Sequence, residues 1–168
     1  MIYQSIRQMN KMLGQLDTWL GKTTEYAQKK PFDANTLLVF RLAPDQHPFV
    51  RQVQLSCDHA KFASARLTGK DAPTHPDDEQ TIDALRARIR GVKTWLDGFN
   101  PADFDGAEKR VVTLPRWEGK GLLGEDYLLE YAIPNFYFHV THAYAILRHN
   151  GLDLGKKDYV GALSLRAS

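Results

Sequence analysis

The chain has 168 residues, of which 43% are hydrophobic and 25% are charged; this balance is typical of a single globular domain with one substantial core. The 22 Lys and Arg residues against 20 Asp and Glu give a formal net charge of +2, which argues against a nucleic-acid-binding protein, because no basic block is present. Cys57 is the only cysteine, so no intrachain disulfide can form, as is usual in a reducing compartment.

The start of the chain does not have the pattern of a secretory signal. Residues 1–7 (MIYQSIR) carry polar side chains where a signal peptide needs a continuous apolar stretch. No segment reaches the roughly 20 apolar residues that span a bilayer. We therefore predict a cytoplasmic protein that binds neither a membrane nor nucleic acid.

The first predicted element is a helix over residues 2–29. Apolar side chains follow one another at alternating spacings of three and four, which places them on one face of a helix: Ile6, Met9, Leu13, Leu16 and Leu20. Pro31 ends this helix. The short apolar run at residues 37–40 (LLVF) is either a covering loop or a short strand.

A second helix is predicted to run to about Leu67. Asp45 is its expected N-cap, and Pro48 is tolerated in a first turn whose amides have no helical partners. Gly69 ends the helix, and two prolines mark the loop that follows. Its inner face is formed by Phe49, Val53, Cys57, Ala60, Ser64 and Leu67, and a second, mostly apolar edge by Leu55, His59 and Phe62.

The third helix has the most regular apolar pattern in the chain, with spacings of 3,4,3,4,3 at Ile82, Leu85, Ile89, Val92, Leu96 and Phe99. Asp77, Asp78 and Glu79 precede it. Because a helix dipole favours negative charge at the N-terminus, we expect these acids to lie at the start of the helix. Asn100 and Pro101 close it.

The chain changes character after residue 100. The run at 110–114 (RVVTL) has the pattern of an extended segment, and Gly119 to Gly121 has the composition of a turn. Together they predict a small hairpin or ordered loop. A fourth helix follows over residues 124–149, with Asn150 and Gly151 as its stop. Pro134 lies inside it and predicts a kink near residues 130–134. Residues 154–161 are expected to pack on the bundle as an ordered extension.

Four helices with one apolar face each bury those faces most simply against one another. The predicted fold class is therefore all-α, an up-down four-helix bundle with a short hairpin or loop insertion before the last helix. We find no internal repeat and no low-complexity tract, so residues 1–168 are predicted to form one domain.

The fourth predicted helix contains two long and unusual segments, Tyr127–Val140 (YLLEYAIPNFYFHV) and Ala143–Gly151 (AYAILRHNG). They resemble the signature of a bacterial family of unknown function within the DinB/YfiT-like superfamily of four-helix bundles. Further similar segments are Pro44, Asp45 and Pro48, residues 51–54 (RQVQ) and residues 154–158 (LGKKD). They are spread over nearly the whole chain.

This resemblance implies a DinB-like bundle that pairs into homodimers. Many members of the superfamily bind a divalent metal with three histidines, one on the second helix and two in a His-x-x-x-His pair on the fourth. Characterised relatives include transferases and isomerases that use low-molecular-weight thiols. The present sequence departs from the pattern, because Ala143 stands four residues after His139 and the nearest histidine is His142.

The resulting hypothesis is a divalent metal, zinc or nickel, bound by His59, His139 and His142. Neutral imidazole is a common ligand for these metals. Residues three apart on a helix share one face, and His59 from a facing helix would leave a position open, as a catalytic metal needs. The alternative is that His139 is a buried, hydrogen-bonded histidine, with His59 and His142 partly exposed.

The remaining polar residues have simpler interpretations. His149 lies in the last turn of the fourth helix, where a cation suits the dipole. Cys57 falls on an apolar face and is expected to be packing rather than a nucleophile. Asp58 points about 100° away from its neighbour His59 on a helix, so it is not expected to orient that imidazole. His47 and His75 are given no role.

Two functions of different classes follow. The first is a metal-dependent enzyme, a hydrolase or a thiol-transferase-like transferase, that acts on a small molecule. The second is a non-catalytic, homodimeric helical-bundle binding module without metal. The first requires a pocket between the second and fourth helices, and the second requires a closed core and a large apolar interface.

Overall fold

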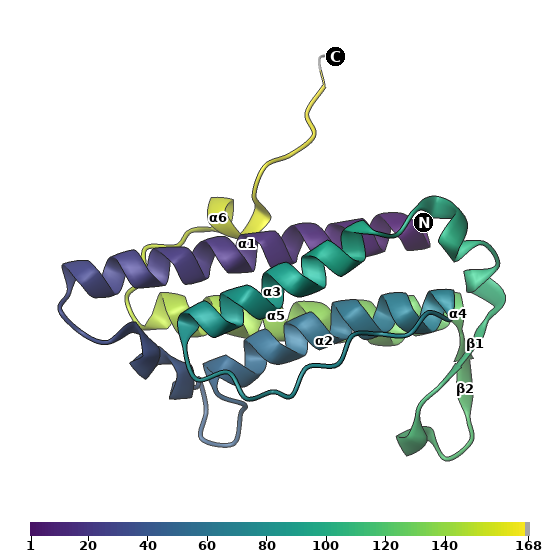
Figure 1. Cartoon of the computed structure of the whole chain (residues 1–168), viewed down its shortest axis with the longest axis horizontal. Coiled ribbons are helices and arrows are strands. Elements are labelled where there is room, and N and C mark those ends of the chain that lie inside the picture. The colour runs from purple at the N-terminus through teal and green to yellow at the C-terminus, as the bar shows by residue number, and fades with distance from the viewer. Residues whose placement is uncertain (167–168) are drawn as a thin grey trace.

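The computed structural model describes residues 1–166 and consists of four long helices packed side by side (Figure 1). They are α1 (Ile2–Lys29), α2 (Phe49–Thr68), α3 (Ile82–Asp97) and α5 (Ile133–His149). One small antiparallel sheet pairs β1 (Val111–Thr113) with β2 (Gly121–Leu123). The predicted all-α bundle with a hairpin before the last helix is confirmed. Within residues 1–166, no helix combines the length and the apolar character needed to cross a bilayer.

Side-chain pairs between the helices give their directions. Arg7 on α1 meets Asp97 at the far end of α3, and Asp17 meets Arg86 near the start of α3; these two helices are therefore antiparallel. Trp19 and then Tyr26 of α1 meet Tyr144 and then Asn150 at the end of α5, through an edge-to-face ring contact and a hydrogen bond; these two helices are therefore parallel.

The α2 helix runs antiparallel to α5, because Gln52 bonds His139 near one end and Arg66 bonds Tyr127 near the other. It follows that α2 and α3 point in the same direction, as Figure 1 shows. The bundle therefore runs up-down-down-up, and the two middle helices do not alternate as in a simple up-down bundle.

The parallel arrangement of α2 and α3 requires a connection that crosses the length of the bundle. Residues 69–81 provide it as an extended segment that returns alongside α2 (Figure 1). Gly69 starts this segment in the left-handed conformation with φ 75°, which glycine adopts without steric cost. Pro73 and Pro76 keep the segment from becoming helical.

Acidic residues in this connection have a different role from the predicted one. Thr81 caps α3, with its side chain accepting a hydrogen bond from the Ala84 amide. Asp77 and Glu79 lie before the cap and bind Arg88 at 2.6 and 3.1 Å. The expectation that these acids start the helix was wrong, because a buried guanidinium attracts them more strongly than a solvated helix end.

Arg88 is 4% exposed and lies at the centre of a buried charge cluster. Besides Asp77 and Glu79, its guanidinium binds Asp58 of α2 at 2.8 Å. The same carboxylate binds the Lys61 ammonium at 3.0 Å, and Lys61 is 2% exposed. Opposite charges therefore neutralise one another in the interior, as buried ions must, and the cluster holds the connecting segment against α2 and α3.

The start of α2 also differs from the expectation. Pro48 is the N-cap, and Asp45 lies outside the helix and is exposed. The Phe49 amide is bound by the Phe40 carbonyl at 2.8 Å, so the preceding segment supplies the capping acceptor. That segment contains a 3-10 helix, η1 (Ala34–Val39), which settles the ambiguity of the apolar run at 37–40.

The last long helix is continuous but changes its hydrogen-bonding pattern. A short α4 (Gly124–Asp126) leads into a π-helical segment, η5 (Tyr127–Ala132), and then into α5. In η5 the Ile133 amide donates to the Leu128 carbonyl, five residues back. The π-helical segment ends at Ala132, two residues before Pro134, and overlaps the region near residues 130–134 for which the sequence predicts a kink.

Several short elements connect and follow the long helices. Before β1 the chain forms η2 (Pro101–Phe104) and η3 (Ala107–Lys109), and η4 (Pro115–Trp117) lies inside the hairpin connection. After α5, the helix α6 (Lys156–Val160) packs on α1, where Lys22 binds the Asp158 carboxylate at 2.5 Å. The predicted packing of this extension on the bundle is confirmed.

We expect Arg88→Met to lower the free energy of unfolding by about 3 kcal/mol, because it leaves three carboxylates without their buried cation. Urea denaturation followed by circular dichroism measures the change. The control is Arg90→Met, since Arg90 lies on the same helix but its ion pair with Asp17 is exposed, and such pairs contribute about 1 kcal/mol or less. Equal losses in the two variants would show that the cluster does not stabilise the fold.

Candidate functional site

A cavity of about 560 Å³ lies between α2, the last long helix and the start of η4. This volume is within the range of small-molecule sites. Polar and charged side chains make up most of its wall. The lining residues are His47, Arg51, Leu55, Asp58, His59, Phe62, Arg66, Leu114, Pro115, Arg116, Tyr131, Asn135 and His139.

One face of α2 supplies half of this wall. Its lining residues recur at helical spacing from Arg51 to Arg66, so they form a single stripe beside the core-facing one. The second edge predicted from the sequence, Leu55, His59 and Phe62, belongs to this stripe. What the sequence indicated as an apolar edge is the floor of a cavity with an arginine at each end.

Two of the three predicted histidines lie together in the cavity. The rings of His59 and His139 stack with centroids 5.2 Å apart and an interplanar angle of 14°. His59 comes from α2 and His139 from α5, so the antiparallel packing of these helices creates the pair. Both side chains line the cavity.

The orientation of His139 is fixed by a glutamine on α2. The Gln52 amide nitrogen donates to the His47 carbonyl at 3.1 Å, so its oxygen faces His139. This oxygen accepts the hydrogen of His139 Nδ1 at 2.8 Å. The Nε2 atom of the neutral ring therefore carries the lone pair.

Burial keeps both imidazoles uncharged at neutral pH. Desolvation, with smaller contributions from the positive charges of Arg66 and Arg116 and against the opposing effect of Asp58, lowers the pKa of His59 to about 4. Desolvation, with smaller electrostatic contributions from three neighbouring imidazoles and Arg51, lowers the pKa of His139 to about 3. Each imidazole therefore offers a neutral nitrogen to a ligand at pH 7.

His142 does not join this pair. Its Nδ1 donates to the Phe138 carbonyl one turn back on the same helix, at 2.7 Å. Its Nε2 then accepts a hydrogen bond from the Gln46 side-chain amide at 3.2 Å. Both ring nitrogens are used, and His142 is not part of the cavity wall.

No three His, Cys, Asp or Glu side chains within residues 1–166 converge closely enough to hold a metal ion. The predicted set of His59, His139 and His142 is therefore not assembled in this structure, although two of its members meet. The burial of the three residues follows the alternative interpretation: His139 is buried and hydrogen-bonded, and the other two are partly exposed.

Cys57 lies on the core side of α2 and is fully buried. Burial raises the pKa of its thiol to about 12, with smaller contributions of both signs from Arg88 and Asp58. A thiol of this kind is protonated at neutral pH and is a poor nucleophile. The prediction that Cys57 is packing is confirmed.

The charges around the cavity leave an excess of positive charge. Asp58 is bound to Lys61 and Arg88, and Arg51 is bound to Asp77 at 2.5 Å. In contrast, Arg66 and Arg116 make no ion pair with a carboxylate in the described part of the chain. Arg66 donates to the Tyr127 hydroxyl, which leaves its charge uncompensated.

Sequence reasoning missed the arginines and the orienting glutamine. The α2 arginines could have been found from their spacing, since Arg66 lies seven residues after His59 and so shares its face. Gln52 lies seven residues before His59 and has the same relation to it. No local sequence signal identifies Arg116 as a cavity residue, because its position beside the cavity depends on how the hairpin folds back on the bundle.

A family model described as a domain of unknown function, DUF1993, matches residues 1–160. The chain belongs to the DUF1993 family. This DUF1993 protein is also 48% identical to a DinB family member protein from Shewanella denitrificans whose crystal structure is known. The match covers 97% of this chain and 93% of the other, with a TM-score of 0.94.

The membership and the structural match confirm the predicted family and its place among DinB-like bundles. No curated protein matches the chain. The reaction and the ligand of this DUF1993 protein therefore have to be inferred from the cavity itself.

The histidine pair predicts how stability depends on pH. Each imidazole has an ordinary pKa of 6.5 when unfolded and a pKa of about 4 or about 3 when folded. Below pH 6.5 the unfolded chain therefore binds more protons, and stability falls as pH decreases. From pH 7 to about 4.5, we expect the wild type to lose about 5 kcal/mol more than a His59→Gln/His139→Gln double variant, with about half of this loss from each imidazole.

Urea denaturation at a series of pH values measures this difference. The matched control is His149→Gln, because His149 is exposed and its substitution is expected to leave the slope unchanged. Burial alone would raise the pKa values of Asp77 and Glu79, but hydrogen bonds from Arg51 to Asp77, from Gln54 to Glu79 and from Arg88 to both outweigh it and lower them, so these two acids act at more acidic pH. A double variant with the wild-type slope would rule out buried neutral imidazoles.

Proposed function

We propose that this protein binds a small organic anion in the cavity between α2 and the last long helix, and that it acts on this ligand as an enzyme. The observation that carries the proposal is the pairing of two neutral imidazoles, His59 and His139, beside two arginines that lack carboxylate partners. Perturbed histidines in a cleft are typical of functional sites.

The arginines determine the class of ligand. Arg66 and Arg116 lie on the cavity wall, and both contribute positive potential at His59. A carboxylate or thiolate placed between them would gain charge-assisted hydrogen bonds, which are about twice as strong as neutral ones. The cavity therefore favours an anion over a neutral or cationic molecule.

The imidazoles supply the chemical group. A neutral imidazole can accept a hydrogen from a bound thiol or hydroxyl, so that the N–H bond forms as the S–H or O–H bond breaks. The resulting thiolate would be stabilised by the arginines, and its negative charge would offset the cost of a buried imidazolium. Thiol transfer, which the family resemblance implies, is the reaction type we propose on this basis: the thiolate sulfur would form a bond to an electrophilic carbon of a second substrate as the bond from that carbon to its leaving group breaks, and the imidazolium would return its proton to the leaving group.

Two small thiols that differ by one charged group test the ligand class. We expect mercaptoacetate to bind about tenfold more tightly than 2-mercaptoethanol, because only the former carries a carboxylate for the arginines. Isothermal titration calorimetry measures both affinities. Arg66→Gln is expected to remove the preference, whereas Arg148→Gln should retain it, since Arg148 is exposed and outside the cavity.

His139→Gln provides a second variant whose fold can be checked by circular dichroism. We expect it to retain the preference for mercaptoacetate over the uncharged thiol but to abolish any thiol-transfer turnover. Equal affinities of the two thiols for the wild type would overturn the proposed anion site. A preference that survives Arg66→Gln would contradict the assignment of that arginine.

A divalent metal, zinc or nickel, is a second candidate ligand. The bond between Gln52 and His139 favours it, because metal-bound histidines usually donate their other ring hydrogen to an oxygen. The residues as placed offer two imidazoles rather than three, so the predicted set does not fit unless His142 gives up its bonds to Phe138 and Gln46. We therefore derive no step through a metal.

Elemental mass spectrometry of the untagged protein, before and after soaking with zinc and nickel, tests this candidate. The observed arrangement predicts that His142→Gln leaves the metal content unchanged, because both ring nitrogens of His142 already have partners, whereas His139→Gln lowers it. One metal per chain that is lost in both variants would instead establish the three-histidine site.

A non-catalytic dimeric module is the competing function. It is favoured by Leu129 and Phe138, whose exposed fractions are 46% and 52% and which lie on the last long helix. Exposed apolar side chains can mark an interface between subunits. Light scattering would determine the assembly, and a dimer that binds neither thiol would support the module over the enzyme.

A further inference from the structure

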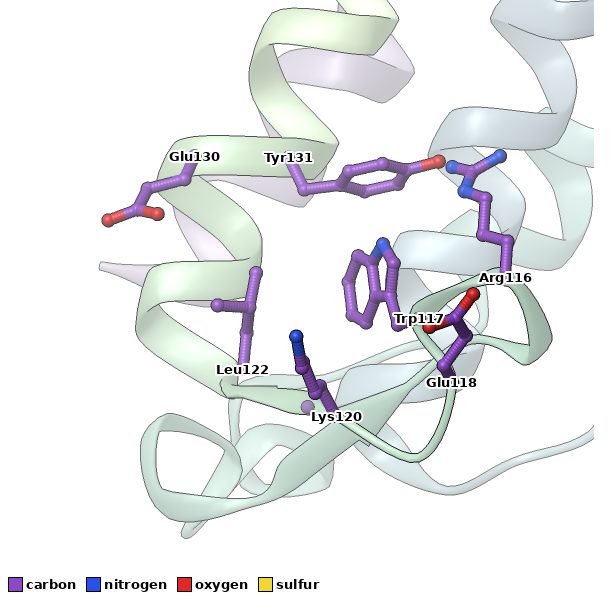
Figure 2. A pocket seen from close by; sticks show the side chains of 8 residues that line it. Arg116, Trp117, Glu118, Lys120, Leu122, Glu130 and Tyr131 are labelled. Atoms are coloured by element: carbon purple, nitrogen blue, oxygen red, sulfur yellow. The ribbon is translucent and has the colours of Figure 1, made fainter.

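A second cavity, of about 520 Å³, adjoins the one that contains the histidine pair. Residues from the connection between the two strands and from the start of β2, within the range 116–122, form one side of it, and Glu130 and Tyr131 of η5 form the other (Figure 2). This volume alone is sufficient for a small organic group. The proposed function uses none of the residues that are specific to this cavity.

The two cavities share a wall made by Arg116 and Tyr131, because these two side chains line both. The Arg116 guanidinium lies over the Tyr131 ring, 5.1 Å from its centroid, and Figure 2 shows the two groups side by side. Arg116 is exposed, so this part of the wall is held by a cation–π contact rather than by packing. A ligand group beside Arg116 is therefore close to both cavities.

Aromatic side chains give the second cavity its character. The Trp117 ring is perpendicular to Tyr131, with centroids 5.4 Å apart, and Tyr131 stacks on Tyr127 at 5.6 Å. Trp117 is only partly buried and lies in the middle of the lining residues in Figure 2. Two aromatic neighbours hold its indole ring in place, so a planar ligand could stack on it with little loss of side-chain freedom.

The charged residues of this cavity form no ion pairs. In the view of Figure 2, the Lys120 ammonium lies on one side of Trp117 and the Arg116 guanidinium on the other. Of the two carboxylates in the wall, that of Glu130 points away and that of Glu118 lies near Trp117. No ion pair involves any of these four side chains within residues 1–166. The wall carries no net charge, so an acidic substituent of an aromatic ligand is best placed at the Arg116 guanidinium, on the wall shared with the positively charged histidine cavity.

We propose that the second cavity holds the aromatic part of the same ligand whose anionic group binds in the histidine cavity. The ligand class is thus an aromatic acid, with its ring against Trp117 and its acid group between Arg116 and Arg66. This inference rests on the proposed function, because it assigns the other end of the same molecule. Trp117 is then a specificity-determining residue, and Arg116 contacts the ligand at the boundary.

The probes are 2-naphthoate, which combines a ring with a carboxylate, and mercaptoacetate, which reports on the histidine cavity alone. We expect 2-naphthoate to bind at least tenfold more tightly to the wild type. Trp117→Ala should remove this advantage and change the affinity for mercaptoacetate less than twofold. The control is Trp95→Ala, because Trp95 is also partly exposed but packs on Phe99 at 4.7 Å, away from both cavities.

Different outcomes separate this inference from the proposed function. Naphthoate binding that needs Arg66 but not Trp117 would overturn this inference alone. Binding that needs Trp117 but not Arg66 would overturn the shared ligand and the anion site together. Should Trp117→Ala fail to fold, nuclear Overhauser effects between naphthoate and the Trp117 indole protons of the wild type decide, and their absence in the bound state would overturn the inference.

Discussion

The Gln52 side chain fixes the register of α2 against α5. It forms one hydrogen bond with His139 across the helix interface and another with the His47 carbonyl, just before the start of α2. A shift of one helical turn, about 5.4 Å, would break both bonds and would separate His59 from His139. The single amide therefore sets the register of the two helices, the tautomer of one imidazole and the position of the second imidazole opposite it.

The connection between α2 and α3 affects the net charge of the histidine cavity, although none of its residues lines that cavity. Because residues 69–81 return along α2, they bring Asp77 to Arg51 and Arg88, and the cluster around Arg88 also takes up the Asp58 carboxylate. Asp58, the one acidic side chain in the cavity wall, is thereby neutralised by cations that lie outside the cavity. A carboxylate without these partners would cancel the field of Arg66 and leave no preference for an anion.

Hydrophobic periodicity was sufficient to predict the helices, since each long helix buries one apolar stripe. The first helix was predicted over the same residues that form α1, and the hairpin and the packed tail were also found. The parallel direction of α2 and α3 was not predictable, because spacing within a helix carries no information on how a loop returns. Asp77 and Glu79 were misplaced for the same reason: their partner Arg88 is close only in the folded chain. The proximity of His59 and His139 was predicted, whereas His142 does not join them, since it bonds its own helix.

Pro134 affects the backbone conformation of the helical segment that lines both cavities. A proline cannot donate a hydrogen bond and clashes with the carbonyl four residues earlier, and the wider π-helical turn of η5 directly before it relieves both problems. Successive residues of an α-helix are about 100° apart around the helix axis. The extra residue in the π-helical turn therefore rotates the side chains that follow it about this axis, relative to those that precede it. Tyr131, within the turn, lines the histidine cavity together with Asn135 and His139, which follow it at spacings of four, and it also reaches Trp117 of the hairpin. The last long helix therefore lines the histidine cavity with three side chains and the second cavity with Glu130 and Tyr131, and its residues that line the second cavity belong to the π-helical turn that accommodates the proline.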